Sequence, residues 1–171
     1  DGLPDFVGAG GNVVIMYVNQ SSGGSFDFSG RVTLSDDFGS ETWSDRRTVD
    51  GRPSFGVYPR YLADVNGDDF PDIVGFGGAG AAIGINKRGI DGTDGFEDLR
   101  FITPAFNVDD PSWYIDYTGP RPTSGCTASI ACRDYGPRIV GDIDGDSRAD
   151  MLGFDDRRIT YQSMPYVSQF E

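Results

Sequence analysis

The sequence predicts an all-β protein made of repeated units of four antiparallel strands. Gly occurs 25 times and Pro 10 times in 171 residues, and aromatic residues make up 13% of the chain. Short apolar runs bounded by Gly, Asp, Asn and Pro dominate, and no stretch keeps the i, i+3, i+4, i+7 apolar spacing of an amphipathic helix. An Asp-rich loop followed directly by an apolar strand occurs twice, which indicates an internal repeat.

The repeat is clearest in two nine-residue loops at positions 64–72 and 142–150, which carry Asp or Asn at loop positions 1, 3, 5 and 9. The segment Asp1–Asp5 matches the second half of such a loop. The last Asp residues of the three copies are separated by 67 and 78 residues. We attribute the longer second interval to an insertion near residues 118–136.

Each unit contains four expected strands in the same order. One strand enters the loop, a second leaves it, a third follows a Gly-rich turn, and a less regular fourth segment comes last. The entering strands are expected at 59–63 and 137–141, the leaving strands from Phe6, Ile73 and Met151, the third strands at 13–18, 81–85 and 158–162, and the fourth segments at 31–34, 99–106 and 166–170.

Four antiparallel strands in a unit of this length are the pattern of a β-propeller blade. We expect an incomplete first blade at 1–57, a second blade at 58–136 that includes the insertion, and the start of a third at 137–171. The chain would then hold about two and three-quarter blades, whereas a propeller closes with at least about four. Either the chain is a fragment of a longer one, or other copies of it, or a companion fragment, are the expected partners that complete the ring.

The repeated loops indicate calcium sites, because alternate oxygen side chains can turn inward onto one hard cation. The expected ligands are Asp64, Asn66, Asp68, the Phe70 carbonyl and Asp72 in one loop, and Asp142, Asp144, Asp146, the Arg148 carbonyl and Asp150 in the other. Asp1 and Asp5 would form a third, incomplete site. Gly at loop position 12 and flanking strands distinguish these loops from EF-hands. A solvated Asp-rich turn is the alternative interpretation.

Composition disfavours several other functions. The formal charge of −13 argues against a nucleic-acid partner, because an acidic surface repels phosphate. No apolar run reaches membrane-spanning length, so membrane insertion is not expected. The chain has no His and no Gly-x-Ser-x-Gly motif, and we expect a protein that is not an enzyme. Paired carboxylates for glycoside hydrolysis remain an open alternative.

Cysteine usage favours an oxidising compartment. Cys126 and Cys132 are expected to form a local disulfide, with free thiols as the alternative, and the protein is expected to be secreted. Asn19-Gln-Ser21 is a glycosylation sequon, which fits a secreted eukaryotic protein. Asn19 and Asn86 both lie 14 residues after the last Asp of a loop, so Asn19 can equally serve a strand-end turn.

The run YPRYLADVNGDDFPDIVGFG at residues 58–77 resembles the FG-GAP (or VCBS) repeat of integrin-like β-propellers. With Phe38-Gly39 and Trp43 before it and the segment 86–96 after it, the chain is most similar to integrin-like mushroom lectins of the Psathyrella velutina type. The resemblance covers nearly the whole chain. It implies a seven-bladed propeller with calcium in its blade loops, which binds N-acetylglucosamine and related glycans in pockets between blades.

A sugar site needs an aromatic face for the apolar side of the ring and polar groups for its hydroxyls. The side chains that recur with the repeat are Trp43, Tyr58, Arg60, Trp113 and Arg138. The aromatic residues could instead pack between blades, and the two arginines could pair with loop carboxylates. The sequence thus favours a secreted, calcium-stabilised lectin. The alternatives are an integrin-like adhesion or scaffold module that binds protein, and the non-catalytic propeller part of a carbohydrate-active enzyme.

Overall fold

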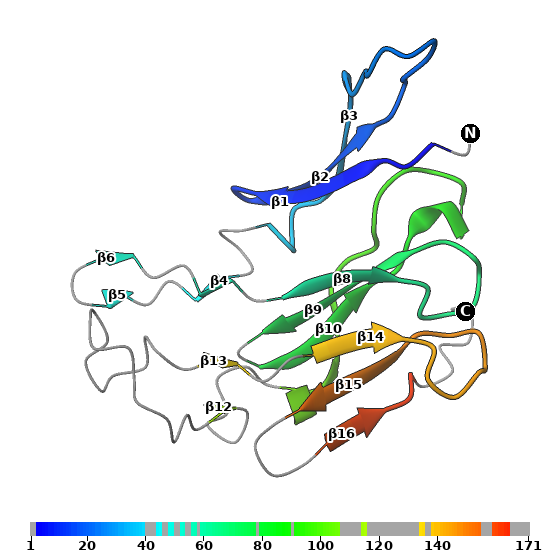
Figure 1. Cartoon of the computed structure of the whole chain (residues 1–171). Helices are drawn as coiled ribbons and strands as arrows, with labels where there is room; N and C mark the ends of the chain where they lie inside the picture. The colour runs from blue at the N-terminus through cyan, green and yellow to red at the C-terminus, as the bar shows by residue number, and fades with distance from the viewer. Residues whose placement is uncertain are drawn as a thin grey trace.

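The structure of this chain, a computed structural model, is all-β (Figure 1). It describes residues 3–39, 59–77, 79–89, 91–106, 138–154 and 159–164, together with six two-residue strands in the intervening segments. Two 3₁₀ turns, η1 (Lys87–Gly89) and η2 (Pro104–Phe106), are the helical elements of the described part. Among these residues no helix has the length and apolarity needed to cross a membrane.

The first sheet consists of β1 (Phe6–Gly10), β2 (Val13–Val18) and β3 (Gly30–Ser35), paired antiparallel in chain order. These strands are the second, third and fourth of a repeat unit, as the sequence predicts. A tight turn joins β1 to β2, and Gly11 there has a φ of 55°, which glycine adopts without steric cost.

The second sheet is a complete four-stranded unit. It contains β8 (Arg60–Ala63), β9 (Asp72–Gly77), β10 (Gly80–Gly84) and β11 (Arg100–Thr103), each paired antiparallel with the next. The expected fourth strand at 99–106 is shorter than predicted, because the chain turns into η2 at Pro104. Proline has no backbone N–H to donate to a strand ladder, which favours the end of the strand at that point.

The third sheet repeats this pattern with β14 (Arg138–Gly141), β15 (Asp150–Phe154) and β16 (Ile159–Gln162). The expected fourth segment at 166–170 lies outside the described residues. Three further pairs of short strands are β4 (Ser44–Asp45) with β7 (Gly56–Val57), β5 (Thr48–Val49) with β6 (Arg52–Pro53), and β12 (Tyr114–Ile115) with β13 (Asp134–Tyr135).

Two apolar cores hold the three sheets face to face. The core between the second and third sheets contains Val74 and Phe76 of β9 together with Met151 of β15. The core between the first and second sheets contains Val14 of β2 and Ile73 of β9. All six residues of β9 are buried because it packs on both sides. The sheets therefore follow one another as propeller blades do, and those described do not close into a ring.

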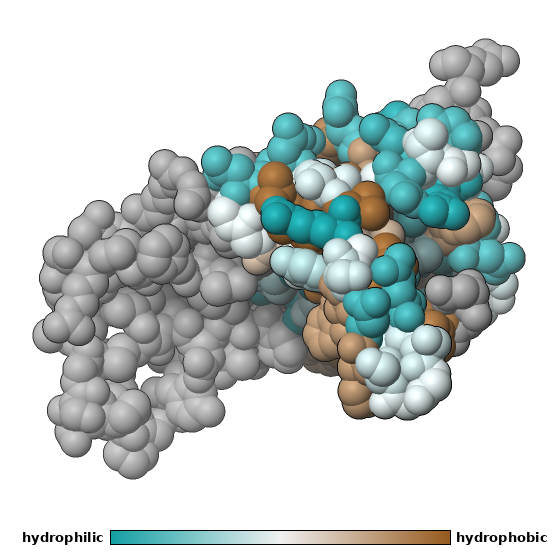
Figure 2. All heavy atoms as spheres, turned by 90° about the horizontal axis from the view of Figure 1, so that it is seen from above, coloured by the Kyte–Doolittle hydropathy of each residue, from teal (hydrophilic) through white to brown (hydrophobic). Residues whose placement is uncertain are grey.

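The surface mixes apolar and polar groups. A space-filling view from above, where the first sheet lies in Figure 1, shows apolar residues exposed among hydrophilic ones (Figure 2).

Candidate functional site

The two complete Asp-rich loops connect β8 to β9 and β14 to β15, and they share five equivalent backbone-to-side-chain hydrogen bonds. In each loop, the carboxylate of the Asp at position 1 accepts hydrogen bonds from amides later in the loop. Asp64 Oδ1 accepts from the Gly67 amide at 2.7 Å, and Asp142 Oδ1 accepts from the Gly145 amide at 2.7 Å. The matching sequence pattern therefore produces matching local structure.

Both loops turn through the left-handed region at positions 4 and 6. Gly67 and Gly145 have φ values of 83° and 85°, whereas Asp69 and Ser147 adopt 68° and 69° although they are not glycine. The second carboxylate oxygen of the position-1 Asp accepts from the amides of these two residues, at 2.8 and 3.0 Å. These bonds help to offset the steric cost of a left-handed residue with a Cβ.

The side chains at positions 3 and 5 each accept a hydrogen bond from the amide two residues later. The bonds join the Asp68 amide to Asn66 at 3.0 Å, the Phe70 amide to Asp68 at 2.9 Å, the Asp146 amide to Asp144 at 3.2 Å, and the Arg148 amide to Asp146 at 2.9 Å. Such turns hold the oxygen-bearing side chains over the loop, where the sequence places the metal ligands.

The Asp at position 9 is buried in both loops. Asp72 is 0% exposed and accepts from the Val65 amide at 2.9 Å and from the Asn86 amide at 2.7 Å. Asp150 is 1% exposed and accepts from the Ile143 amide at 3.0 Å. Each of these carboxylates therefore connects its loop to the sheet through hydrogen bonds.

Asn19 serves the strand-end turn that its repeat position predicts. Its amide N–H donates to Asp5 Oδ1 at 2.8 Å, and its side-chain nitrogen donates to the Pro4 carbonyl at 3.0 Å. Asn86 makes the equivalent side-chain bond to the Pro71 carbonyl at 2.9 Å. The nitrogen that a glycan would occupy on Asn19 is therefore already bonded, in a residue that is 7% exposed.

Negative charge is concentrated around Asp72, where the loop 64–72 meets the second sheet. Burial raises the pKa of Asp72 to about 6, and the charges of Asp68 and Asp64 add to this rise, although the two backbone hydrogen bonds lower the pKa. An ionised carboxylate here is costly unless a cation lies nearby.

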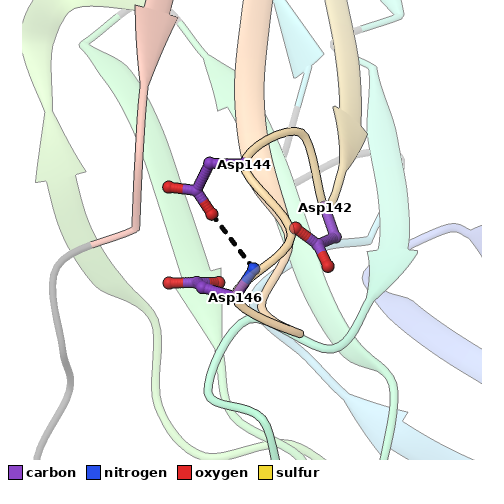
Figure 3. Close-up of side chains that lie close together, drawn as sticks. All are labelled: Asp142, Asp144 and Asp146. Atoms are coloured by element: carbon purple, nitrogen blue, oxygen red, sulfur yellow. Dashed lines mark hydrogen bonds between the residues drawn. The ribbon is translucent and has the colours of Figure 1, made fainter.

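The carboxylates of Asp142, Asp144 and Asp146 converge (Figure 3). One oxygen from each lies within 4.8 Å of the others, and all three residues are exposed. An all-oxygen donor set of this kind fits calcium by its chemistry. Arg148 donates to Asp146 in an ion pair, which holds the pKa of that carboxyl below its usual range. In the other loop Asn66 replaces one carboxylate, and its amide nitrogen donates to Asp68 Oδ2 at 3.0 Å.

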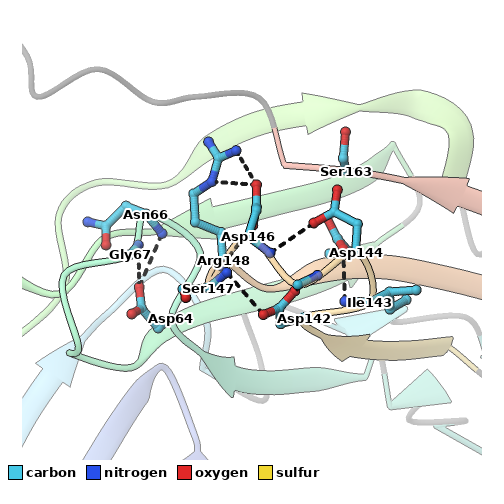
Figure 4. Close-up of polar contacts among 12 residues, drawn as sticks. Asp64, Asn66, Gly67, Asp142, Ile143, Asp144, Asp146, Ser147, Arg148 and Ser163 are labelled. Carbon is cyan, nitrogen blue, oxygen red and sulfur yellow. Dashed lines mark hydrogen bonds and ion pairs between the residues drawn. The ribbon is translucent and has the colours of Figure 1, made fainter.

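The two loops also touch each other across the junction of the second and third sheets (Figure 4). The Ala149 amide donates to the Asp64 carbonyl at 2.6 Å. A Cβ added at Gly67 would lie 3.3 Å from Arg148 Cγ, so the arginine side chain covers that glycine.

Beside the loop 64–72, a groove of about 370 Å³ lies between the first and second sheets. Its walls include Met16 of β2, Leu62 of β8 and Phe70 of the loop, and the two last are 43% and 39% exposed. Arg88 and Asp94 contribute polar groups to the groove and form an ion pair at 2.5 Å. The groove thus combines apolar walls with a charged pair.

The second junction differs from the first in the residue that follows its loop. Met164 stands 14 residues after Asp150, where the other repeats have Asn19 and Asn86, and it is buried in the core between the second and third sheets. A long apolar side chain thus fills this junction.

The sugar-binding residues predicted from the sequence are only partly described. Trp43, Tyr58 and Trp113 lie outside the residues with described side chains, as do Asp1, Cys126 and Cys132. Arg60 donates to the Gly39 carbonyl at 2.9 Å. Arg138 is 4% exposed, and its guanidinium lies 5.9 Å from the Phe76 ring centre. Neither arginine lines the groove, and their roles toward a sugar stay predictions.

The groove residues Leu62, Phe70, Arg88 and Asp94 were not singled out from the sequence as sugar contacts. One signal was available. Loop position 7 carries Phe70 in one copy and Arg148 in the other, and an aromatic residue next to a metal loop is a plausible contact for a ligand. The sequence pattern predicts a role only for the Phe70 carbonyl, as a metal ligand.

No protein-family model and no curated protein match the chain. Among solved structures, it is similar to a lectin from Agrocybe aegerita, described for its specific recognition of non-reducing terminal N-acetylglucosamine. The TM-score is 0.48 and the identity is 19%, over 95% of this chain and 38% of that chain. The chain thus spans well under half the length of the lectin.

Proposed function

We propose that this chain is a calcium-stabilised carbohydrate-binding protein and not an enzyme. The observation that carries the proposal is the groove between the first and second sheets, where Leu62 and Phe70 lie near the Arg88–Asp94 pair. Small-ligand sites are concave and mainly apolar, with a few polar groups that fix orientation. A sugar ring suits such a site, because it has an apolar face of C–H groups and an edge of hydroxyls.

The proposed ligand is a glycan with N-acetylglucosamine-type residues. The methyl of an N-acetyl group would contact the apolar walls at Met16 and Leu62, and its amide would bond to the polar groups of Arg88, Asp94 or Asn86. The sequence resemblance to mushroom lectins is the reason for naming this sugar class. Secretion is part of the same proposal and is supported by the expected disulfide between Cys126 and Cys132.

Calcium is proposed for both complete loops, with the ligand sets predicted from the sequence. The support is the convergence of Asp142, Asp144 and Asp146, together with the matched hydrogen bonding of the loop 64–72. When bound, calcium would supply the positive charge that these carboxylates lack. The incomplete loop that holds Asp5 is expected to bind more weakly or not at all.

Calcium binding and sugar binding would be coupled through the loop 64–72. Phe70 and Pro71 belong to the loop 64–72 and also line the groove. Ordering of this loop by calcium would therefore fix one wall of the groove, and sugar binding should weaken in EDTA.

The test is isothermal titration calorimetry with N-acetylglucosamine and its β1,4-linked dimer, in calcium and in EDTA. Phe70→Ala should weaken binding at least tenfold, which corresponds to about 1.4 kcal/mol. Phe101→Ala is the matched control, because Phe101 lies on β11, is 53% exposed and does not line the groove. Equal affinities for the wild type and Phe70→Ala would exclude the groove as the site. The absence of binding to either sugar would contradict the proposed ligand.

A separate titration with calcium alone tests the metal sites. Two sites are expected in the wild type and one in Asp144→Asn, because that carboxylate belongs to the converging cluster of the loop 142–150. Absence of calcium binding to the wild type would contradict the metal assignment without affecting the sugar test.

A further inference from the structure

Position 3 is where the two complete loops differ among the positions that carry an oxygen-bearing side chain at 1, 3, 5 and 9. The loop 64–72 has Asn66 there, whereas the loop 142–150 has Asp144. Asn66 is also the one asparagine of the sequence that a glycine follows, Gly67. Asparagine is a thermolabile residue. Glycine has no Cβ, so its backbone nitrogen can approach the preceding side chain closely. The pair Asn66–Gly67 therefore favours deamidation.

Deamidation at this pair is an attack of the Gly67 backbone nitrogen on the side-chain carbonyl carbon of Asn66. The nitrogen loses its proton and forms a new C–N bond, while the bond from the same carbon to Nδ2 breaks. Nδ2 takes up the proton and leaves as ammonia. Water then opens the cyclic succinimide at either of its carbonyls. The products are aspartate at position 66 and isoaspartate, in which the main chain runs through the side-chain carbon.

The folded loop holds both reacting groups in other hydrogen bonds. The Gly67 N–H donates to Asp64 Oδ1 at 2.7 Å (Figure 4). An amide bonded to a carboxylate gives up its proton less readily, because the resulting anion would lie beside a negative charge. The side chain of Asn66 is held at both ends by Asp68: Oδ1 accepts from the Asp68 amide at 3.0 Å, and Nδ2 donates to Asp68 Oδ2 at 3.0 Å. Attack therefore requires the loop to open.

The other loop shows what each product would do. Asp144 Oδ1 accepts from the Asp146 amide at 3.2 Å, as Asn66 Oδ1 accepts from the amide of Asp68, so an aspartate at position 66 fits the same turn. It would lose the bond that Nδ2 donates and would place a second carboxylate beside Asp68. Isoaspartate lengthens the main chain by one carbon before Gly67, so the amides of the loop no longer match the carboxylate that they share.

We propose that Asn66 is a deamidation site that is protected while Asp64 holds the Gly67 amide and that reacts when the loop 64–72 opens. Gly67 is exposed and Asn66 is half-buried, so the water that opens the succinimide has access to the site. Local opening of a surface loop is far less costly than unfolding of the sheets, and the reaction rate follows the population of the open loop. The reaction requires neither sugar nor calcium.

The test is incubation of the full chain in EDTA in slightly alkaline buffer, followed by mass spectrometry of the peptide that contains Asn66. Asp64→Ala should deamidate there at least tenfold faster than the wild type, because losing a hydrogen bond to a charged group raises the open population by about this factor or more. Asp142→Ala is the matched control. It removes the equivalent carboxylate from the other loop and should leave the rate at Asn66 unchanged.

Two further samples set the limits of the rate. The wild type unfolded in urea gives the rate without protection, and the folded wild type should react at least tenfold more slowly than this. Asn66→Gln should abolish the mass change in the same peptide and the isoaspartate detected there by enzymatic methylation. Circular dichroism checks that the Asp64 and Asp142 variants remain folded, and Asp64→Asn, which keeps the shape of the side chain, replaces Asp64→Ala if that variant unfolds.

Several results would overturn the proposal. They are a folded wild type that reacts at Asn66 as fast as the urea-unfolded chain, a folded Asp64 variant that reacts no faster than the wild type, and an Asp142→Ala variant that accelerates the reaction equally. A urea-unfolded chain that keeps Asn66 intact would also overturn it, because the pair would then not be reactive even without protection.

Discussion

Replacing Asp72 with Asn should destabilise the calcium-loaded protein and should change stability little once calcium is removed. Asp72 is 0% exposed, and burial raises its pKa from an ordinary 3.8 to about 6. Without a cation, the ionised carboxylate therefore opposes folding at neutral pH. Asn has nearly the same shape and carries no charge, so the substitution removes this cost.

The magnitudes nearly cancel in the absence of metal. At about 1.4 kcal/mol per pH unit, the raised pKa corresponds to a gain of about 3 kcal/mol when the charge is removed. Against this, the amide of Asn86 or of Val65 loses its charged acceptor, which costs about 1.5–3 kcal/mol. The net change in EDTA should lie within about 1–2 kcal/mol of zero.

Calcium changes the balance, because a ligand at 100 times its dissociation constant stabilises the folded state by about 2.7 kcal/mol. If Asp72→Asn removes this binding, the variant should have a lower free energy of unfolding than the wild type in calcium. The difference between the two proteins should be about 2–3 kcal/mol larger in calcium than in EDTA. Urea unfolding at neutral pH, followed by circular dichroism in both conditions, measures the difference.

Asp69→Asn is the matched control, since it removes the same charge from the same loop. Asp69 is exposed and has a φ of 68°, which Asn tolerates, and it is not among the proposed ligands. It should behave alike in calcium and in EDTA. If Asp72→Asn lost the same stability in both conditions, calcium ligation by Asp72 would be refuted.

Three other predictions concern stability and modification. In EDTA, stability should fall as pH rises from about 4 to about 6, because the folded state keeps the Asp72 proton that the unfolded chain has released; urea unfolding across this range should show the fall in the wild type and not in Asp72→Asn. Gly80→Ala should destabilise the protein by more than about 3 kcal/mol, because its Cβ would lie 2.1 Å from the Thr103 carbonyl oxygen at a φ of 131°. Gly92→Ala, at a φ of 77° with no atom within 4 Å, should cost only about 1–2 kcal/mol, and similar thermal unfolding of the two would contradict this reasoning. Asn19 should carry no glycan when the protein is secreted from a eukaryotic host, so the intact mass should equal that of the polypeptide; a hexosamine-containing adduct at this residue would show that the strand-end turn opens during synthesis.

The sequence alone predicted the strands and the loops because their signals are local. A continuous run of apolar residues marks the strand at 13–18, and the structure has β2 with the same bounds. Asp and Asn spacing marks the turns, and the two loops share their main backbone hydrogen bonds, since each side chain bonds to an amide only a few residues away. The repeat spacing also predicted the role of Asn19, because its partner Asp5 lies at a fixed distance along the unit.

Tertiary structure decided how the side chains fill each junction. The position occupied by Phe76 in the second sheet is Ala9 in the first, and the position of Asn86 becomes Met164 in the third repeat. Phe76 and Met164 therefore fill the second junction, whereas the smaller or polar residues at the first leave a groove beside Phe70. The strand pattern in the sequence indicates which residues are apolar and which of them lie on the same face of a sheet. The space between two sheets depends instead on the volumes of the side chains that both sheets contribute. Those volumes meet only when residues from distant parts of the chain are brought together by folding.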